Sequence, residues 1–321
     1  MAHLSQRRSE NVSGDFYVDR TCIDCDTCRW MAPEVFTQAG DQSAVYHQPA
    51  DEKERLRAMQ ALLSCPTASI GFLLRIIRRV ESLMQALLSC PTASIGTVEK
   101  PVDIKAAQES IPIAISANVY HCGYHAESSF GAASYLIQRS EGNVLVDSPR
   151  FAPPLVRRLE EMGGVRYVYL THRDDVADHQ KFHQHFGCDR ILHSDEITSS
   201  TRDVEIKLTG QEPVQLAPDL LIIPVPGHTK GHTVLLYDQT FLFTGDHLAW
   251  SEERGHLIAF RYACWYSWAE LTQSMKKLLS YSFEWVLPGH GRRYHSDRAT
   301  MHQQMEQCVR WIEGKDEGYH P

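Results

Sequence analysis

The chain has 321 residues, which is long enough for a small and a large domain. Of these residues 43% are hydrophobic and 22% are charged, a composition typical of globular proteins. Its net charge of -8 argues against nucleic acid as a partner, because phosphate binding relies on clustered lysine and arginine. No apolar run reaches the length of a membrane span, and residues 1–14 lack the apolar core of a signal peptide.

Histidine and cysteine are both abundant in this chain. The count of 17 histidines favours metal chemistry. The 9 cysteines are an odd number, and the first three are separated by two-residue spacers, which favours thiolate ligands over disulfides. We therefore expect a reducing, intracellular compartment, either the cytoplasm or the plastid stroma.

Four cysteines in the N-terminal part have the spacing of iron–sulfur ligands. They are Cys22, Cys25, Cys28 and Cys65. The short spacers let three thiolates surround one cluster, and Cys65, which precedes Pro66 after a helix predicted over 51–64, supplies the fourth. Residues 14–70 resemble the single-cluster [4Fe-4S] ferredoxins, and the resemblance implies one such cluster. A zinc site and free thiols are the alternatives.

A 13-residue segment occurs twice without change, which indicates a recent duplication. Residues 59–71 recur as 84–96, offset by 25 positions, so that Cys90 duplicates Cys65. Only one of these cysteines can complete the cluster at a time. The spacing from the third cysteine favours Cys65, and Cys90 is the alternative.

The pattern of the chain changes after this cysteine-rich part. Residues 14–99 are predicted to form a ferredoxin-like α+β domain, and the polar stretch 100–112 reads as a linker. Short β-runs then alternate with helices, such as those predicted over 153–162 and 178–186. This alternation predicts a layered α/β domain over 113–312.

Side chains that bind metals follow four of the predicted strands. They are His172, Asp174, Asp175, Asp178 and His179 after a strand over 165–170, His228 after 221–225, Asp246 after 240–243 and His290 after 284–287. A glycine precedes each of the last three, and glycine permits the tight turn that would direct a ligand to a shared centre. Imidazoles and carboxylates grouped in this way bind Zn, Mn or Fe. For the first group alone, a solvated charged loop is the alternative.

These four strand ends, in this order, resemble the metallo-β-lactamase superfamily over residues 113–294. The resemblance implies an αββα sandwich, in which two packed sheets carry helices outside and metals at one edge. It implies one metal held by His172, Asp174 and His228. It implies a second metal held by Asp178, His179 and His290, with Asp246 between the two.

The first motif departs from the superfamily pattern H-x-H-x-D-H. An aspartate replaces the second histidine, and two extra residues precede Asp178. Whether Asp174 or Asp175 is the ligand stays open, and so does whether Asp178 and His179 reach the metals. A carboxylate in place of an imidazole favours Fe or Mn over Zn. If Asp178 is not a ligand, we expect it to act as the catalytic proton acceptor.

Other residues near these motifs have two interpretations. Aromatic residues cluster between Asp246 and His290, among them Trp265 and Tyr266, and they form either core or the wall of a substrate pocket. His232 could hydrogen-bond a metal ligand.

The leading hypothesis is a metal-dependent hydrolase of a thioester, lactone or phosphoester. It would hold one or two divalent ions (Zn, Fe or Mn) and a structural or regulatory [4Fe-4S] cluster, and it would act on a small-molecule substrate. One alternative is an oxidoreductase, in which the cluster receives electrons from a redox partner protein and passes them to an iron-containing site. A second is a non-catalytic electron-transfer or interaction protein.

Overall fold

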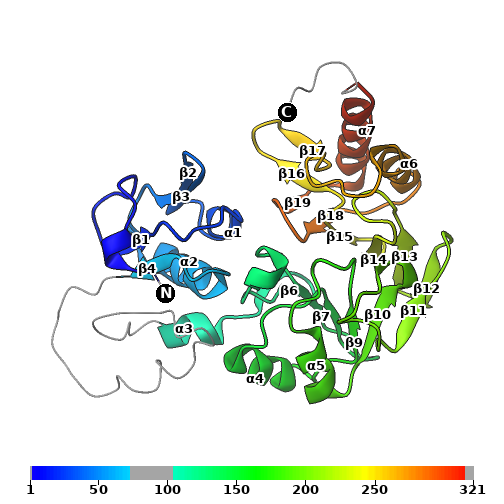
Figure 1. Ribbon diagram of the computed structural model, residues 1–321, viewed down its shortest axis with the longest axis horizontal. Helices are drawn as coiled ribbons and strands as arrows, with labels where there is room; N and C mark the ends of the chain where they lie inside the picture. The colour runs from blue at the N-terminus through cyan, green and yellow to red at the C-terminus, as the bar shows by residue number, and fades with distance from the viewer. Residues whose placement is uncertain (1, 73–103, 315–321) are drawn as a thin grey trace. The chain divides into compact units, whose positions relative to one another are not determined.

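The computed structural model describes residues 2–72 and 104–314 (Figure 1). The chain divides into two compact units. The first unit comprises Met1–Arg166 and Ala177–Gly187, and the second comprises Tyr167–Val176 and Cys188–Pro321. Within the described part of the chain, every helix is too short or too polar to span a bilayer.

The N-terminal part of the first unit contains two antiparallel strand pairs and two α-helices. In chain order its elements are the 3-10 turn η1 (Leu4–Gln6), β1 (Phe16–Val18), α1 (Thr27–Met31), β2 (Phe36–Ala39), β3 (Gln42–Val45), α2 (Glu52–Ser64) and β4 (Ile70–Phe72). β1 pairs with β4, and β2 pairs with β3. The first copy of the duplicated segment therefore supplies the strand that closes on β1. The second copy, with Cys90, lies outside the described residues.

Helix α2 confirms the helix predicted over 51–64. Asp51 caps it, because its carboxylate accepts a hydrogen bond from the backbone N–H of Glu54 at 2.8 Å. Its buried side chains include Met59 and Leu62, which are three residues apart and so share one face. The helix ends at Ser64, which places Cys65 at the turn that leads into β4.

The rest of the first unit is a strand meander with three helices. Its elements are α3 (Ile104–Glu109), β5 (Ile113–Ser116), β6 (Val119–His121), the 3-10 turn η2 (Glu127–Ser129), β7 (Tyr135–Ile137), β8 (Val144–Val146), α4 (Pro153–Glu161) and α5 (His179–Phe186). β5 pairs antiparallel with β6, β6 with β7, and β7 with β8. α4 and α5 confirm two predicted helices, whereas α3 falls within the predicted linker. The predicted division into 14–99 and 113–312 stays a prediction.

The second unit contains most of the remaining strands. Its elements are β9 (Tyr167–Tyr169), β10 (Asp189–His193), the 3-10 turn η3 (Ser194–Glu196), β11 (Ile206–Leu208), β12 (Val214–Ala217), β13 (Leu220–Pro224), β14 (Thr233–Tyr237), β15 (Phe241–Gly245), β16 (Ala249–Ser251), β17 (His256–Ile258), α6 (Trp268–Leu278), β18 (Trp285–Pro288), β19 (Tyr294–His295) and α7 (Arg298–Gly314). β10 lies parallel to both β9 and β11. A six-stranded sheet has the order β12-β13-β14-β15-β18-β19, and β16 pairs with β17.

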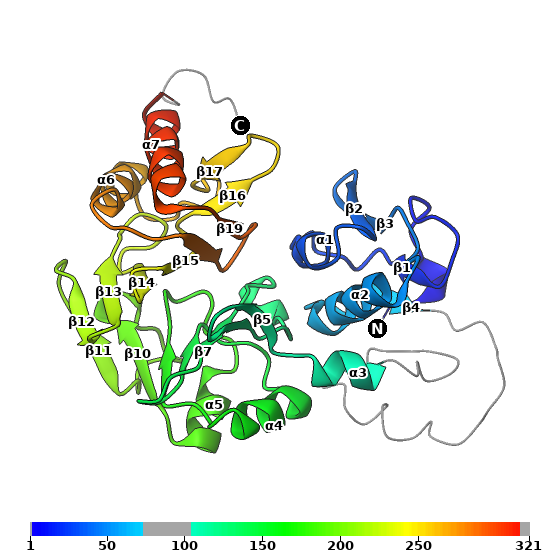
Figure 2. The same ribbon diagram turned by 180° about the vertical axis from the view of Figure 1, so that it is seen from behind.

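Helices α6 and α7 cover one face of the six-stranded sheet (Figure 2). Ile223 of β13 and Val234 of β14 belong to one buried cluster with Met275 of α6 and Met305 of α7. Ile222, which points to the opposite face of β13, is fully buried as well. Burial on both faces explains why these strands are continuous apolar runs in the sequence.

Three strands of this sheet run in the same direction. β13 and β15 are both antiparallel to β14, and β18 is parallel to β15. Their carboxyl ends therefore lie at the same edge of the sheet. His228, Asp246 and His290 follow these three ends, so the topology gathers them at that edge.

Candidate metal centres

The four predicted cluster cysteines line one small pocket of the first unit. They are Cys22, Cys25, Cys28 and Cys65, and all four are free thiols rather than disulfides. Backbone N–H groups approach two of the sulfurs. The nitrogen of Asp24 lies 3.5 Å from the sulfur of Cys22, and the nitrogen of Ser69 lies 3.3 Å from that of Cys65. Such N–H contacts stabilise thiolate sulfur.

Burial keeps the thiols of Cys25 and Cys28 protonated unless a metal replaces the proton. It raises the pKa of Cys25 to about 12 and the pKa of Cys28 well above its usual value, and the neighbouring cysteines add to both effects. Four thiols that share one buried pocket, with N–H donors directed at sulfur, fit an iron–sulfur cluster, whose iron ions hold thiolates at neutral pH.

A segment before β7 covers Cys25 within the same unit. Thr27 Oγ1 lies 3.3 Å from the sulfur of Cys25 and 3.2 Å from Nδ1 of His125. Nε2 of His125 lies 2.8 Å from Nε2 of His121. Gly131 has a φ of +85°, and a Cβ there would lie 3.0 Å from the sulfur of Cys25, so glycine suits this close approach. Sequence reasoning missed the contacts of His125 with Thr27 and of Gly131 with Cys25, because each joins residues about a hundred positions apart.

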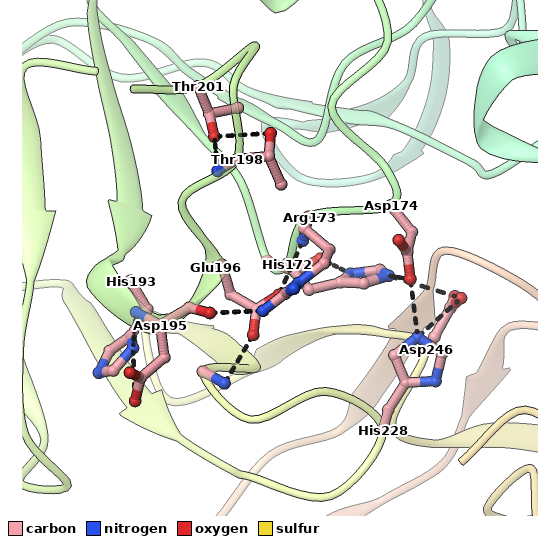
Figure 3. Close-up of polar contacts among 12 residues, drawn as sticks. His172, Arg173, Asp174, His193, Asp195, Glu196, Thr198, Thr201, His228 and Asp246 are labelled. Carbon is pink, nitrogen blue, oxygen red and sulfur yellow. Dashed lines mark hydrogen bonds and ion pairs between the residues drawn. The ribbon is translucent and has the colours of Figure 1, made fainter. Parts of the chain in front are cut away.

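Two histidines and two aspartates of the second unit converge at the sheet edge (Figure 3). They are His172, Asp174, His228 and Asp246. Oδ2 of Asp174 lies 3.8 Å from Nε2 of His172 and 3.6 Å from Nε2 of His228. Oδ2 of Asp246 lies 3.7 Å from each of the same two nitrogens. Tetrahedral donors around a divalent ion are roughly 3.3–3.6 Å apart, so these four atoms surround a space of about that size.

A second donor set overlaps with the first. His172, Asp175 and Asp246 are buried, and each offers one donor atom within 4.8 Å of the others. The sequence left open which of Asp174 and Asp175 could be a ligand. In the structure each of them belongs to a set that could hold an ion.

Glycines allow the strand ends to approach each other closely. Gly245 has a φ of +49°, and a Cβ there would lie 2.5 Å from Oγ1 of Thr171. A Cβ on Gly289 would lie 2.7 Å from Oδ2 of Asp175 and 3.1 Å from Oδ1 of Asp246. Any larger residue at these two positions would displace a side chain of the centre.

The protonation states at this centre suit metal binding. Burial lowers the pKa of His172 to about 4, although the charge of Asp246 opposes the shift. Contact with His228 lowers the pKa of Asp174, against the opposing effect of burial. Burial raises the pKa of Asp246, but the charge and hydrogen bond of His290 outweigh it and hold that pKa well below its usual value. At neutral pH the His172 imidazole is therefore neutral and both carboxylates are charged, which is the form that ligates a cation.

His232 supports two members of the centre. Its ring stacks on that of His172, with centroids 4.9 Å apart, and its Nε2 accepts a hydrogen bond from the backbone N–H of Asp246 at 3.3 Å. Burial, with the charges of His172 and His228, holds the pKa of His232 well below its usual value, so this imidazole is a neutral acceptor.

Comparisons with known proteins bear on the fold of the two parts of the chain. Residues 18–72 match the family described as the 4Fe-4S single cluster domain of Ferredoxin I. A search of curated proteins by sequence finds no match. Among solved structures, VMB-1 superposes with a TM-score of 0.50 at 16% identity, over 63% of this chain and 96% of that one. DIM-1 metallo-β-lactamase gives a TM-score of 0.49 at 16% identity, over 62% of this chain and 95% of that one.

The larger part of the chain has the metallo-β-lactamase fold, as its likeness to VMB-1 shows. ETHE1 from Myxococcus xanthus is also similar, with a TM-score of 0.44 at 16% identity over 62% of this chain and 92% of that one. The likeness to VMB-1 confirms the fold class predicted from the strand-end motifs, and the family match confirms the N-terminal single-cluster ferredoxin domain.

The ligand roles predicted for the metallo-β-lactamase motif all stay predictions. In the first unit, Asp178 accepts a hydrogen bond from the backbone N–H of Phe151 at 2.8 Å, and its carboxylate lies 2.9 Å from Nζ of Lys181. His179 is buried at the first turn of α5. His290 contacts the donor sets through its hydrogen bond to Asp246. The catalytic role expected of Asp178 is likewise a prediction.

Proposed function

We propose that the chain is a metal-dependent hydrolase of a thioester, lactone or phosphoester, and that its ferredoxin domain holds one [4Fe-4S] cluster in a structural or regulatory role. The observation that carries this proposal is the convergence of two imidazole nitrogens and two carboxylate oxygens at the sheet edge, where each nitrogen lies 3.6–3.8 Å from each oxygen. His172, Asp174, His228 and Asp246 would hold the ion.

A divalent ion held by these donors would supply Lewis acidity and would lower the pKa of bound water toward neutrality. The residues around it set its geometry. Nδ1 of His172 lies 3.0 Å from Oγ1 of Thr171, which leaves Nε2 for the ion. His290 bonds Oδ1 of Asp246 and leaves Oδ2 facing the two histidines. In the net reaction, water oxygen bonds to the acyl or phosphoryl centre, the bond to the leaving sulfur or oxygen breaks, and a water proton passes to the leaving group.

The second candidate is an oxidoreductase, and the composition of the donor set favours it. Two carboxylates with two imidazoles form a harder ligand set than three imidazoles, and carboxylate–histidine sets with open positions suit iron. A ferredoxin domain on the same chain could supply electrons, one at a time, from a redox partner protein.

Turnover and metal content separate the two candidates. Full-length protein, purified without oxygen and supplied in turn with Zn, Mn and Fe, should cleave at least one member of a panel of generic thioesters, lactones and phosphodiesters. His228→Ala should lower that rate by more than about 100-fold, because it removes a ligand. His302→Ala, at an exposed position on α7, is the matched control and should retain full activity. No turnover with any of the metals would contradict the hydrolase. In protein purified without added metal, two zinc ions and only the four irons of the cluster per chain would contradict the oxidoreductase.

We expect a small-molecule substrate, because small-molecule sites commonly lie at the edge of a sheet. The cytoplasm or the plastid stroma is the proposed compartment, because free thiols and an iron–sulfur cluster persist under reducing conditions.

A further inference from the structure

A cavity of about 560 Å³ opens beside the metal centre of the second unit. Its lining consists of Arg173, Asp174, Thr229, Lys230, Trp265 and Tyr266. Asp174 belongs to the four-donor set, so the cavity and the metal centre share a wall. A molecule held in the cavity would lie next to the atoms that would bind the ion.

Two exposed aromatic side chains, those of Trp265 and Tyr266, line this cavity. Among the described residues of the second unit, the large exposed hydrophobic side chains are Tyr262 at 74%, Trp265 at 69% and Tyr266 at 49%. All three lie within five positions of the chain. Clustered exposure of this kind marks a binding surface more often than scattered exposure does.

Backbone hydrogen bonds fix the loop that carries Trp265 and Tyr266. The N–H groups of Trp265 and Tyr266 both donate to the carbonyl oxygen of His228, at 2.9 and 3.0 Å. The N–H of Ser267 donates to the carbonyl of Gly227 at 3.0 Å, and the same serine caps α6. The aromatic loop is therefore fastened to the turn that carries a predicted metal ligand, and its exposure does not come from a loose loop.

Two cations face the same cavity. The buried carboxylate of Glu196 holds Arg173 through Nε at 2.9 Å and also accepts from the backbone N–H of Gly231 at 2.6 Å. Nη1 of Arg173 makes no hydrogen bond among the described residues. Lys230 is 56% exposed, and its Nζ lies 3.1 Å from Oδ1 of Asp195. A fixed guanidinium and an exposed ammonium beside aromatic faces suit a ligand that is both planar and anionic.

We propose that this cavity binds the part of the substrate that does not react, and that this part is an aromatic or similarly planar group bearing a carboxylate or phosphate. The ring stacks on Trp265, and the anionic group is held by Arg173 and Lys230. This assignment names the substrate class of the centre described above and rests on the proposed hydrolase function.

Equilibrium binding tests the cavity separately from catalysis. Full-length holoprotein is titrated calorimetrically with 2-naphthoate, with its neutral isostere 2-naphthamide, and with cyclohexanecarboxylate, which keeps the charge and lacks the aromatic ring. We expect 2-naphthoate to bind at least about tenfold more tightly than either analogue. Trp265→Ala and Lys230→Gln should each weaken naphthoate binding by about five- to tenfold, because stacking and charge pairing each contribute on that scale.

Tyr46→Ala is the matched control, since Tyr46 is an aromatic residue of the first unit with the same 49% exposure as Tyr266. Equal affinity for the three ligands, or naphthoate binding that Trp265→Ala leaves unchanged, would overturn the proposal. Self-association that Trp265→Ala abolishes, without naphthoate binding, would assign the aromatic loop to a second copy of the chain and would also overturn it.

Hydrolysis of the neutral ester 4-nitrophenyl acetate, measured on the same samples, keeps the two claims apart. If the protein hydrolyses this ester but binds 2-naphthoate no more tightly than the two analogues, only the cavity assignment is wrong. If the protein binds 2-naphthoate selectively but does not hydrolyse the ester, only the proposed hydrolase function is wrong.

Discussion

Nδ1 of His290 lies 2.6 Å from Oδ1 of Asp246, while Oδ2 of the same carboxylate faces His172 and His228 at 3.7 Å. One carboxylate thus connects a histidine after β18 to the two histidines that would bind the ion. His290 fixes the orientation of Asp246 and stabilises its charged form.

This relationship predicts that His290→Ala weakens metal binding, but by less than the removal of a direct ligand such as His228. His290→Ala should weaken binding of the divalent ion by about 10- to 100-fold, because Asp246 loses the partner that orients it. A competition titration with a chelating dye measures the affinity, and His302→Ala is the control. Loss of the ion as complete as in His228→Ala would instead place His290 among the direct ligands.

The two neighbouring aspartates should respond differently to neutral replacement. Asp174→Asn should weaken binding of the ion held by the four donors, because it removes one of them. Asp175→Asn should weaken binding only at the set of His172, Asp175 and Asp246, so that one ion stays bound. Metal analysis of both variants after equilibrium dialysis gives the stoichiometry. If Asp175→Asn removed all bound divalent metal and Asp174→Asn removed none, the assignment of the four donors would be wrong.

The close approach of Gly131 to Cys25 predicts a defect in cluster content. In Gly131→Ala the new Cβ would lie 2.8 Å from Cβ of Cys25, and we expect overpacking to cost about 1–3 kcal/mol and to lower the cluster content. Absorbance near 400 nm and iron analysis report that content. Gly210→Ala is a matched control, because Gly210 has a similar φ of +81° and open space around its Cα. Equal cluster content in the two variants would contradict this packing argument.

Apolar runs and glycine turns are local signals, so the sequence could place His172, His228 and Asp246 after the ends of predicted strands. In the structure Oδ2 of Asp246 lies 3.7 Å from Nε2 of each of these two histidines, and their role as metal ligands stays a prediction. Local pattern could not choose between Asp174 and Asp175, because burial and neighbours from other strands decide their geometry. It also missed the contact of Thr27 with His125, which depends on tertiary packing alone.

A buried arginine makes the second unit sensitive to acid. Arg190 is almost fully buried, and its Nη2 lies 2.7 Å from Oε1 of Glu205. Burial raises the pKa of Glu205, but hydrogen bonds and the charge of Arg190 outweigh it and lower that pKa from 4.5 to about 2. Because the folded-state pKa is depressed, this stabilisation is complete above about pH 4.5 and is lost as the pH falls toward 2.

Urea unfolding of the wild type and Glu205→Gln checks that prediction. The wild type should be more stable than Glu205→Gln at pH 6, and the gap should narrow as the pH falls from 4.5 toward 2. A gap that stays constant over that range would contradict the assigned ion pair.

Metal analysis of the anaerobically purified full-length protein and of His228→Ala tests the central claim most directly. We predict that the wild type holds the four irons of one cluster and at least one further divalent ion. His228→Ala should lose that further ion and keep the four irons. A wild type with four irons and no further divalent ion, or a further ion that His228→Ala retains in full, would contradict the account.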